Sequence, residues 1–223
     1  MVLKSGLTVV PPQDAVPRWP ANNGATLQLQ PRTDMEIKAR PQFEHAPVEQ
    51  SFGSLVPVRL ALAAEVRHRS VSALNRLLAH TTALRDLYKK AHWQTSGANF
   101  YELHTLFDKH HDEQERAMDM LAERIQTLGG VAFALAREIV EETRLARAPS
   151  GTETPHQQLQ RLVQAHEFIL AEARPLARDV AASDDFGTHD MIVGQVLRTN
   201  EQQSWFVTRI LTSPSDGTSA VHR

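Results

Sequence analysis

The spacing of apolar residues predicts two long amphipathic helices in the first part of the chain. Between residues 58 and 94, apolar side chains recur three and four positions apart, which is the stripe of an amphipathic helix. A second stripe follows the loop "TSGAN", in which Asn99 can cap a helix, and it stops at Gly129 and Gly130. The stripes consist of Leu74, Leu77, Leu78, Thr81, Leu84, Leu87 and Tyr88, and of Phe100, Leu103, Leu106, Phe107, Met118, Leu121 and Ile125.

The later part of the chain predicts two more long helices. We expect one over residues 155–182, bent at Pro175, and one over residues 188–211. Residues 131–154 are less regular and end in a loop rich in Ser, Gly, Thr and Pro, so we expect a short helix there at most. Four long helices with short or moderate connections favour an all-α four-helix bundle.

Both ends of the chain differ from the bundle region. Residues 1–57 contain prolines at 11, 12, 17, 20, 31, 41, 47 and 57 and lack a sustained helical period, so we interpret them as an extended N-terminal arm. Residues 213–223 are predicted to form a flexible C-terminal tail, which leaves residues 58–212 as the bundle domain. The arm carries five basic and five acidic residues and is therefore not a basic tail.

Composition excludes several classes of protein. With 223 residues and 41 % hydrophobic content, the chain can bury one core. The net charge of -2 and pI near 6.6 argue against a wholly basic nucleic-acid-binding surface. Since there is no cysteine, any metal must be bound by His and carboxylate ligands. No signal peptide is evident, and no apolar run reaches the roughly eighteen residues of a membrane span, so we expect a soluble, cytoplasmic protein.

The second predicted helix carries a set of residues that could bind metal. His104, Asp108, Asp119 and Glu123 fall within about a 100° sector of its surface. At a rise of about 1.5 Å per residue, however, Asp108 and Glu123 lie roughly 22 Å apart, too far to share an ion. A two-fold axis that pairs antiparallel copies of this helix would bring the two halves together, and His92 could join from the preceding helix. The spacing therefore predicts a dimer with two equivalent sites.

The ligand types favour a first-row transition metal. Imidazole and carboxylate without thiolate suit Fe(II), Mn(II) or Zn(II), and iron redox chemistry fits this set best. Any one of these residues alone would more often be solvated or paired with Arg or Lys. Their joint spacing is what favours a metal site.

The segment from "LNRLLAHTTALRDLYKKAHWQTSGANF" to "DMLAERIQTLGG" resembles the Dps family, the mini-ferritins named as DNA-binding proteins from starved cells. Its pattern H-x11-H-x3-D-x10-D-x3-E is met by the five residues named above, with Trp93 directly after the first histidine and "GANF" before the second helix. The resemblance covers about residues 60–212, is weaker over residues 155–182, and excludes the arm.

The resemblance implies a ferritin-like fold, a hollow homododecamer and ferroxidase activity. His92, His104 and Asp108 of one subunit would bind iron together with Asp119 and Glu123 of the next. Fe(II) would be oxidised there, by hydrogen peroxide in preference to oxygen, and ferric mineral would be stored in the shell, which protects against oxidative damage. Trp93 would lie beside the site and intercept stray oxidising equivalents, but we favour an ordinary role as a core aromatic, and both roles can hold together.

Weaker candidates lie elsewhere. Acidic residues at the start of the last helix are commonly explained by the helix dipole, while the resemblance raises the alternative of an iron-conducting three-fold pore, for which Asp190 is preferred. Three residues of the arm could hold an extra metal site, but we favour a solvated role for them. A solvated face is also the favoured position of two histidines in the second predicted helix. These candidates are Asp184, Asp185 and Asp190; Glu44, His45 and Glu49; and His110 and His111.

Two further motifs bear on the type of site. A Glu-x-x-His spacing joins Glu153 to His156, but it falls within a predicted loop and so does not support a di-iron centre inside one bundle. The zinc-protease motif HExxH is absent.

DNA binding gives the resembled family its name, and a basic tail commonly mediates it through phosphate contacts. The balanced arm and a tail with few charges depart from that pattern, although Lys38 and Arg40 could form a local cluster. The alternative to a ferroxidase is therefore a structural, DNA-compacting protein of the nucleoid whose metal site mainly holds the dimer together.

Overall fold

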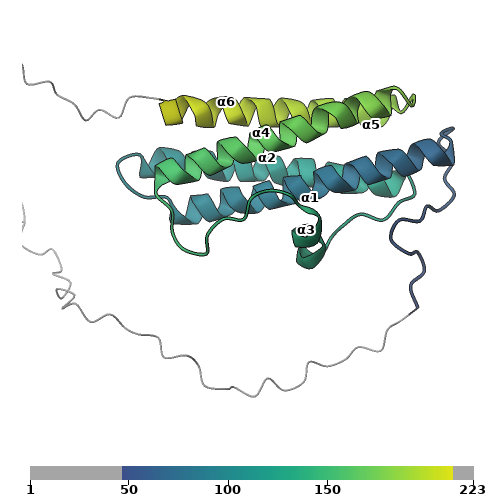
Figure 1. The fold of residues 1–223 in the computed structure, drawn as a ribbon, viewed down its shortest axis with the longest axis horizontal. Helices are drawn as coiled ribbons and strands as arrows, with labels where there is room; N and C mark the ends of the chain where they lie inside the picture. The colour runs from purple at the N-terminus through teal and green to yellow at the C-terminus, as the bar shows by residue number, and fades with distance from the viewer. Residues whose placement is uncertain (1–46, 213–223) are drawn as a thin grey trace, which may run out of the picture. The chain divides into compact units, whose positions relative to one another are not determined.

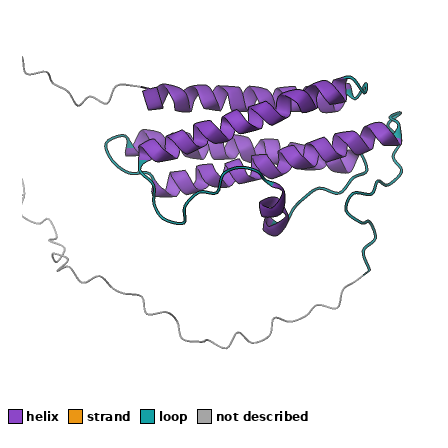
Figure 2. Ribbon diagram, viewed as in Figure 1, coloured by secondary structure: helices purple, strands orange, loops and turns teal. Residues whose placement is uncertain are grey.

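The computed structural model describes residues 47–212, and every regular element among them is a helix (Figures 1 and 2). The order is α1 (Ala64–Gln94), α2 (Phe100–Thr127), α3 (Ala136–Glu142), α4 (Pro155–Ala181), α5 (Phe186–Met191), the π-helix η1 (Ile192–Leu197) and α6 (Arg198–Thr212). The predicted all-α four-helix bundle is confirmed, including the short helix between the second and third long helices. The predictions for the arm up to residue 46 and for the tail from residue 213 lie outside the described residues.

The bundle has two layers of antiparallel helices. In Figure 1, α1 and α2 form one layer, and α4 packs with the continuous run of α5, η1 and α6 in the other. Helix α3 lies on the connection from α2 to α4 and contacts α1. None of the described helices is long and apolar enough to cross a membrane.

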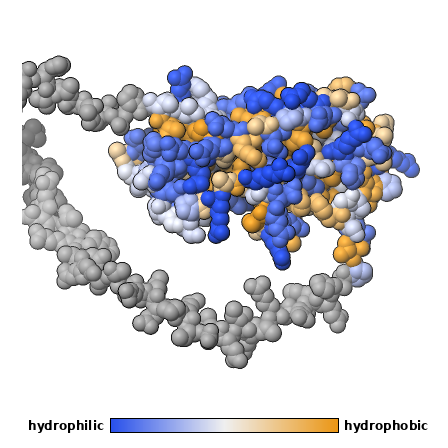
Figure 3. Space-filling model, in the orientation of Figure 1, coloured by the Kyte–Doolittle hydropathy of each residue, from blue (hydrophilic) through white to orange (hydrophobic). Residues whose placement is uncertain are grey.

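The core is the apolar face of each long helix turned inward. Each fully buried Leu, Ile or Phe stabilises the fold by about 1.5–3 kcal/mol relative to an exposed side chain. The surface on the side shown in Figure 3 is mixed, with apolar patches scattered among polar side chains. The largest side chains with almost no exposure are Tyr88, Phe107, Leu74, Leu77, Leu78, Leu84, Leu121, Ile125, Leu128, Leu162, Ile169 and Ile192.

The first helix begins six residues later than the pattern predicts. Residues 58–63 are not helical, because the preceding segment is tied to the end of α2. The Val56 N–H donates to the carbonyl of Gly129 at 2.9 Å, and the Arg67 guanidinium donates to the carbonyls of Val56 and Leu128. Gly129 has φ +84°, and a Cβ there would lie 2.5 Å from the Val56 carbonyl oxygen. Only glycine fits that crossing.

The ends of the other helices follow local capping chemistry. Thr154 and Gln157 form a capping box ahead of Pro155, which starts α4. Helix α4 continues through Pro175 to Ala181, so the proline does not end it. The last helical run starts two residues before the predicted position, because the buried Asp185 carboxylate accepts the Thr188 N–H. Asn99 stands at the N-terminus of α2, but its side chain makes no capping bond.

Candidate metal centre

The predicted ligands His92 and His104 hold each other in place. They lie at the end of α1 and in the first turns of α2, on either side of the "TSGAN" loop. The Nδ1 of His92 lies 2.8 Å from the carbonyl oxygen of His104, and the Nδ1 of His104 lies 2.9 Å from the carbonyl oxygen of His92. The two rings stack with centroids 3.7 Å apart. Because a carbonyl can only accept, both Nδ1 atoms carry the proton, and both Nε2 atoms are left as metal ligands.

Asp108 lies next to this histidine pair. Its Oδ1 is 3.8 Å from Nδ1 of His92 and accepts a hydrogen bond from the Lys89 ammonium at 2.7 Å. That hydrogen bond is the main reason why the pKa of Asp108 is lowered, and the positive charge of Lys89 adds to it. A surface depression joins these groups and is lined by His92, His104, Thr105, Asp108, Lys109, Asp112 and Arg116. The first three predicted ligands therefore share one open hollow.

The other two predicted ligands lie elsewhere in the same chain. Asp119 and Glu123 are exposed on the later turns of α2. A helix rises about 1.5 Å per residue, so Glu123 is roughly 22 Å from Asp108 along the axis. One chain thus presents two separate halves of the predicted site on one helix, and neither half closes around an ion by itself.

A group that the sequence reasoning missed lies beside Asp108. Within residues 47–212, Asp108, His111 and Asp112 form a group in which one ligand atom of each lies within 4.8 Å of the others. His111 Nδ1 is 3.0 Å from Asp112 Oδ1, and its Nε2 is 3.6 Å from Glu115 Oε2. The spacing D-x2-H-D on a helix would have been a signal for this group, because positions three and four apart share a face.

Two predictions about individual residues of this region are wrong. His110 does not lie on a solvated face: it is fully buried, and its Nδ1 is 3.1 Å from the Tyr88 hydroxyl. Its place in the apolar series 103, 107, 110, 114, 117 and 121 would have indicated this. Trp93 is not a core aromatic of the subunit, since 72 % of it is exposed.

The acidic residues before the last helix have different surroundings. Asp184 and Asp190 are exposed, so they remain candidates for a pore. Asp185 is 1 % exposed, and its carboxylate accepts from the Ser70 hydroxyl, the Arg124 guanidinium and the Thr188 N–H. This carboxylate binds the helix run to the first layer and is not free to line a channel, so the pore prediction is withdrawn for Asp185.

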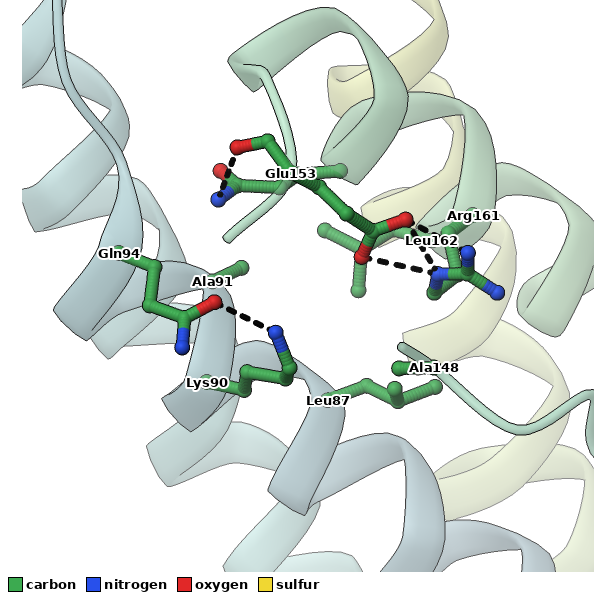
Figure 4. Close-up of a pocket in the computed structure, with 9 residues that line it drawn as sticks. Leu87, Lys90, Ala91, Gln94, Ala148, Glu153, Arg161 and Leu162 are labelled. Atoms are coloured by element: carbon green, nitrogen blue, oxygen red, sulfur yellow. Dashed lines mark hydrogen bonds and ion pairs between the residues drawn. The ribbon is translucent and has the colours of Figure 1, made fainter. Parts of the chain in front are cut away.

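Glu153 and His156 do not form a metal site. Glu153 precedes α4 and is bound by the Arg161 guanidinium at 2.6 Å, whereas His156 is exposed in the first turn of the helix. His156 thus belongs to the predicted helix over residues 155–182 and not to the loop that was predicted to hold both residues of this spacing. Figure 4 shows Glu153 and Arg161 across a small hollow from Lys90, which donates to Gln94. The charged groups of this hollow are already paired, so we assign it no ligand. In the arm, Glu44 and His45 lie outside the described residues, and Glu49 is exposed.

Comparison with known proteins identifies the family. The ferritin-like domain profile matches residues 71–214. A nutrient stress-induced DNA-binding protein of Synechococcus is 30 % identical over 74 % of this chain and 94 % of its own length. The structure of DpsC from Streptomyces coelicolor is 45 % identical, covers 79 % of this chain and 100 % of its own, and superposes with a TM-score of 0.74. The chain belongs to the Dps family of ferritin-like proteins.

Other Dps structures resemble the chain in the same region. Dps from Thermosynechococcus elongatus is 27 % identical, covers 71 % of this chain and 98 % of its own, and has a TM-score of 0.64. The Dps resemblance predicted from the metal-ligand pattern is therefore confirmed at the level of family and fold.

Proposed function

We propose that this Dps-family protein is a ferroxidase that oxidises Fe(II) at sites shared between two subunits, and that it uses hydrogen peroxide in preference to oxygen. The observation that supports it most is the reciprocal bonding of His92 and His104, which fixes both imidazoles with Nε2 unprotonated, while the His92 ring lies beside Asp108. Rigid imidazoles with carboxylates are suited to divalent iron. Since Asp119 and Glu123 are exposed and distant on the same helix, a second copy would supply them across a two-fold axis.

The residues of the chain would act on iron as a substrate. Two Fe(II) ions held at one site can give two electrons to one peroxide molecule, so that it is reduced to water without release of a hydroxyl radical. The carboxylates would retain the harder Fe(III) product until it moves on to be stored as ferric mineral inside a homododecameric shell. Zn(II) and Mn(II) would compete for the same ligands.

A mixing experiment tests both the ligands and the sharing of the site. One variant carries His104→Ala with Asp108→Ala, and the other carries Asp119→Ala with Glu123→Ala. Each alone should lose rapid peroxide-dependent Fe(II) oxidation, followed by the absorbance of Fe(III). When the two are unfolded, mixed equally and reassembled, random pairing should restore about a quarter of the sites, because a site then needs one half from each variant.

The controls separate the possible failures. His156→Ala removes an exposed histidine outside the site and should leave the rate unchanged. Wild-type rates in both double variants would refute the ligand assignment, and no recovery on mixing would refute the shared site. A native mass measurement with metal analysis gives the number of subunits and the bound metal.

A second candidate function, DNA binding, is favoured by the names of relatives alone. The Synechococcus relative is named a DNA-binding protein, and a Bacillus anthracis relative, 27 % identical, is named a DNA protection during starvation protein. A gel-shift titration across salt concentrations tests it, because phosphate contacts weaken steeply as salt rises. Absence of any shift at low salt would exclude this function for the purified protein.

A further inference from the structure

A hydrogen-bonded chain of polar side chains crosses the centre of the apolar bundle. It consists of Tyr88 from α1, His110 from α2, His166 from α4 and Asn200 from α6, and we call it the core network. None of the four is more than 1 % exposed. Buried polar groups are retained at a cost unless each finds a partner. The proposed iron chemistry assigns no role to any of them.

The protons of the core network can be placed by starting at Asn200. Its Nδ2 donates to the carbonyl of Val196 at 2.7 Å, which leaves Oδ1 to accept from Nδ1–H of His166 at 2.8 Å. His166 Nε2 is then unprotonated and accepts from the Tyr88 hydroxyl at 2.6 Å. The Tyr88 oxygen in turn accepts from Nδ1–H of His110 at 3.1 Å. The phenol therefore has a proton acceptor on one side and a donor on the other.

This arrangement suits a tyrosine that loses an electron. Oxidation of a phenol makes its proton strongly acidic, so the electron leaves readily only if a base takes the proton at the same time. Burial lowers the pKa of His166 to about 4, which keeps the imidazole neutral and able to accept that proton. The resulting imidazolium would still donate to Asn200, and His110 would still donate to the oxygen of the phenoxyl radical.

Tyr88 is also close to the candidate metal centre and connected to the surface. It lies one helical turn before His92, a rise of about 6 Å. On its other side, a series of neighbouring rings leads to the surface. The ring centroids are 5.1 Å apart between Tyr88 and His110, 5.9 Å between His110 and Phe206, and 4.8 Å between Phe206 and Trp205. Trp205 is 54 % exposed. The network thus lies between the iron ligands and an exposed aromatic ring.

We propose that Tyr88 is a redox-active residue which gives one electron to an oxidant formed at the iron site and its hydroxyl proton to Nε2 of His166. This inference rests on the proposed ferroxidase function. When one Fe(II) alone meets H2O2, it supplies one electron and leaves Fe(III), hydroxide and a hydroxyl-radical equivalent. Tyr88 supplies the second electron, so that this equivalent becomes a second hydroxide. A later Fe(II) returns an electron to the phenoxyl radical, and His166 returns the proton.

The sequence provides a matched control, because the chain has only two tyrosines, Tyr88 and the exposed Tyr101. In a Tyr101→Phe background, any tyrosyl radical must come from Tyr88. We would mix this variant with less Fe(II) than there are sites and with H2O2, freeze-quench it, and record its electron paramagnetic resonance spectrum. A tyrosyl signal is expected that is lost in Tyr88→Phe with Tyr101→Phe, and more hydroxyl radical should then be captured by a spin trap.

A second measurement needs no iron. Azide radicals produced by pulse radiolysis oxidise exposed tryptophan in the metal-free protein, and an electron from Tyr88 should then convert the indole radical into a phenoxyl radical with its own absorption band. In the Tyr101→Phe background, this conversion should be lost on adding Tyr88→Phe and reduced on adding His166→Gln. The His166→Gln variant keeps the tyrosine, so it also serves if Tyr88→Phe does not fold.

The two measurements distinguish the possible failures. Rapid iron oxidation without a Tyr88-dependent radical in either measurement would overturn this inference and leave the ferroxidase function intact. Absence of rapid iron oxidation would overturn the ferroxidase function, and with it the iron-coupled role of Tyr88. An unchanged radical yield in His166→Gln would overturn the assignment of His166 as the proton acceptor.

Discussion

Replacement of Lys89 by Gln should strengthen metal binding at the candidate centre. The Lys89 ammonium donates to Asp108 Oδ1 at 2.7 Å, so it neutralises the carboxylate that a metal ion would need. A divalent cation must therefore break this ion pair and tolerate a nearby positive charge. Glutamine keeps similar bulk and a hydrogen-bond donor, but it lacks the charge.

The size of the effect follows from two contributions. The side chains of Lys89 and Asp108 are 30 % and 44 % exposed, so their ion pair contributes only about 0.2–1 kcal/mol. Repulsion between an ammonium and a divalent ion at about 4 Å adds roughly 2 kcal/mol in water, and less if the lysine swings away or salt screens it. At about 1.4 kcal/mol per factor of ten, we expect the Zn(II) dissociation constant to fall roughly tenfold in Lys89→Gln.

Calorimetric titration of metal-free protein with Zn(II), a redox-inert ion, would measure this change. Lys90→Gln is the matched control, because Lys90 lies on the same helix but donates to Gln94 and to the carbonyl of Gly151, away from Asp108. Equal affinities in the two variants, or weaker binding in Lys89→Gln, would refute the view that Lys89 competes with the metal for Asp108.

Three further predictions concern stability. Burial lowers the pKa of His166 from 6.5 to about 4, so the unfolded chain binds more protons than the folded one between these pH values. The free energy of unfolding should therefore fall, by at most about 3 kcal/mol, as the pH falls from 6.5 towards 4. Chemical denaturation across that range should show a shallower decline in His166→Gln, and an identical slope would contradict the assignment. Asp185→Asn weakens the buried pair with Arg124 and should cost about 3 kcal/mol, measured by denaturation against the exposed control Asp184→Asn; a loss no larger than the control's would contradict it. Gly129→Ala places a Cβ 2.5 Å from the Val56 carbonyl at φ +84° and should lower stability by about 1–3 kcal/mol, whereas Gly151→Ala, with open space around it, should not; equal stabilities would refute the crossing as a constraint.

The helices could be predicted from the sequence because their apolar stripes are long and regular. The structure agrees with the pattern at the ends where local chemistry decides, as at Thr154 and Pro155. The structure differs from the pattern at the start of α1. Residues 58–63 resemble a helix in composition but are not helical, and Arg67 in the first turn of α1 binds the end of α2. Such a long-range contact leaves no periodic signal. The same holds for Asp185, whose partner Ser70 is 115 positions away.

The candidate site was predictable as a spacing but not as a set of contacts. The positions of His104, Asp108, Asp119 and Glu123 on one helix follow from the helical repeat alone. The mutual support of His92 and His104 requires the "TSGAN" loop to fold α2 back onto α1, and the competition from Lys89 requires the register of that packing. Neither is determined by spacing within one helix.

The core network shows why the bundle interior is a poor alternative iron site. A di-iron centre inside a four-helix bundle needs several carboxylates that project inward. Here the centre offers imidazoles, a phenol and amides, and the adjacent carboxylate of Glu113 accepts from Gln203 and pairs with Lys109. Two imidazoles whose protons point to Asn200 and Tyr88 can transfer a proton, but they cannot balance the charge of two iron ions. The interior therefore fits the proposed transfer of a proton and an electron, while the exposed face of α2 carries the carboxylates that the proposed ferroxidase would use.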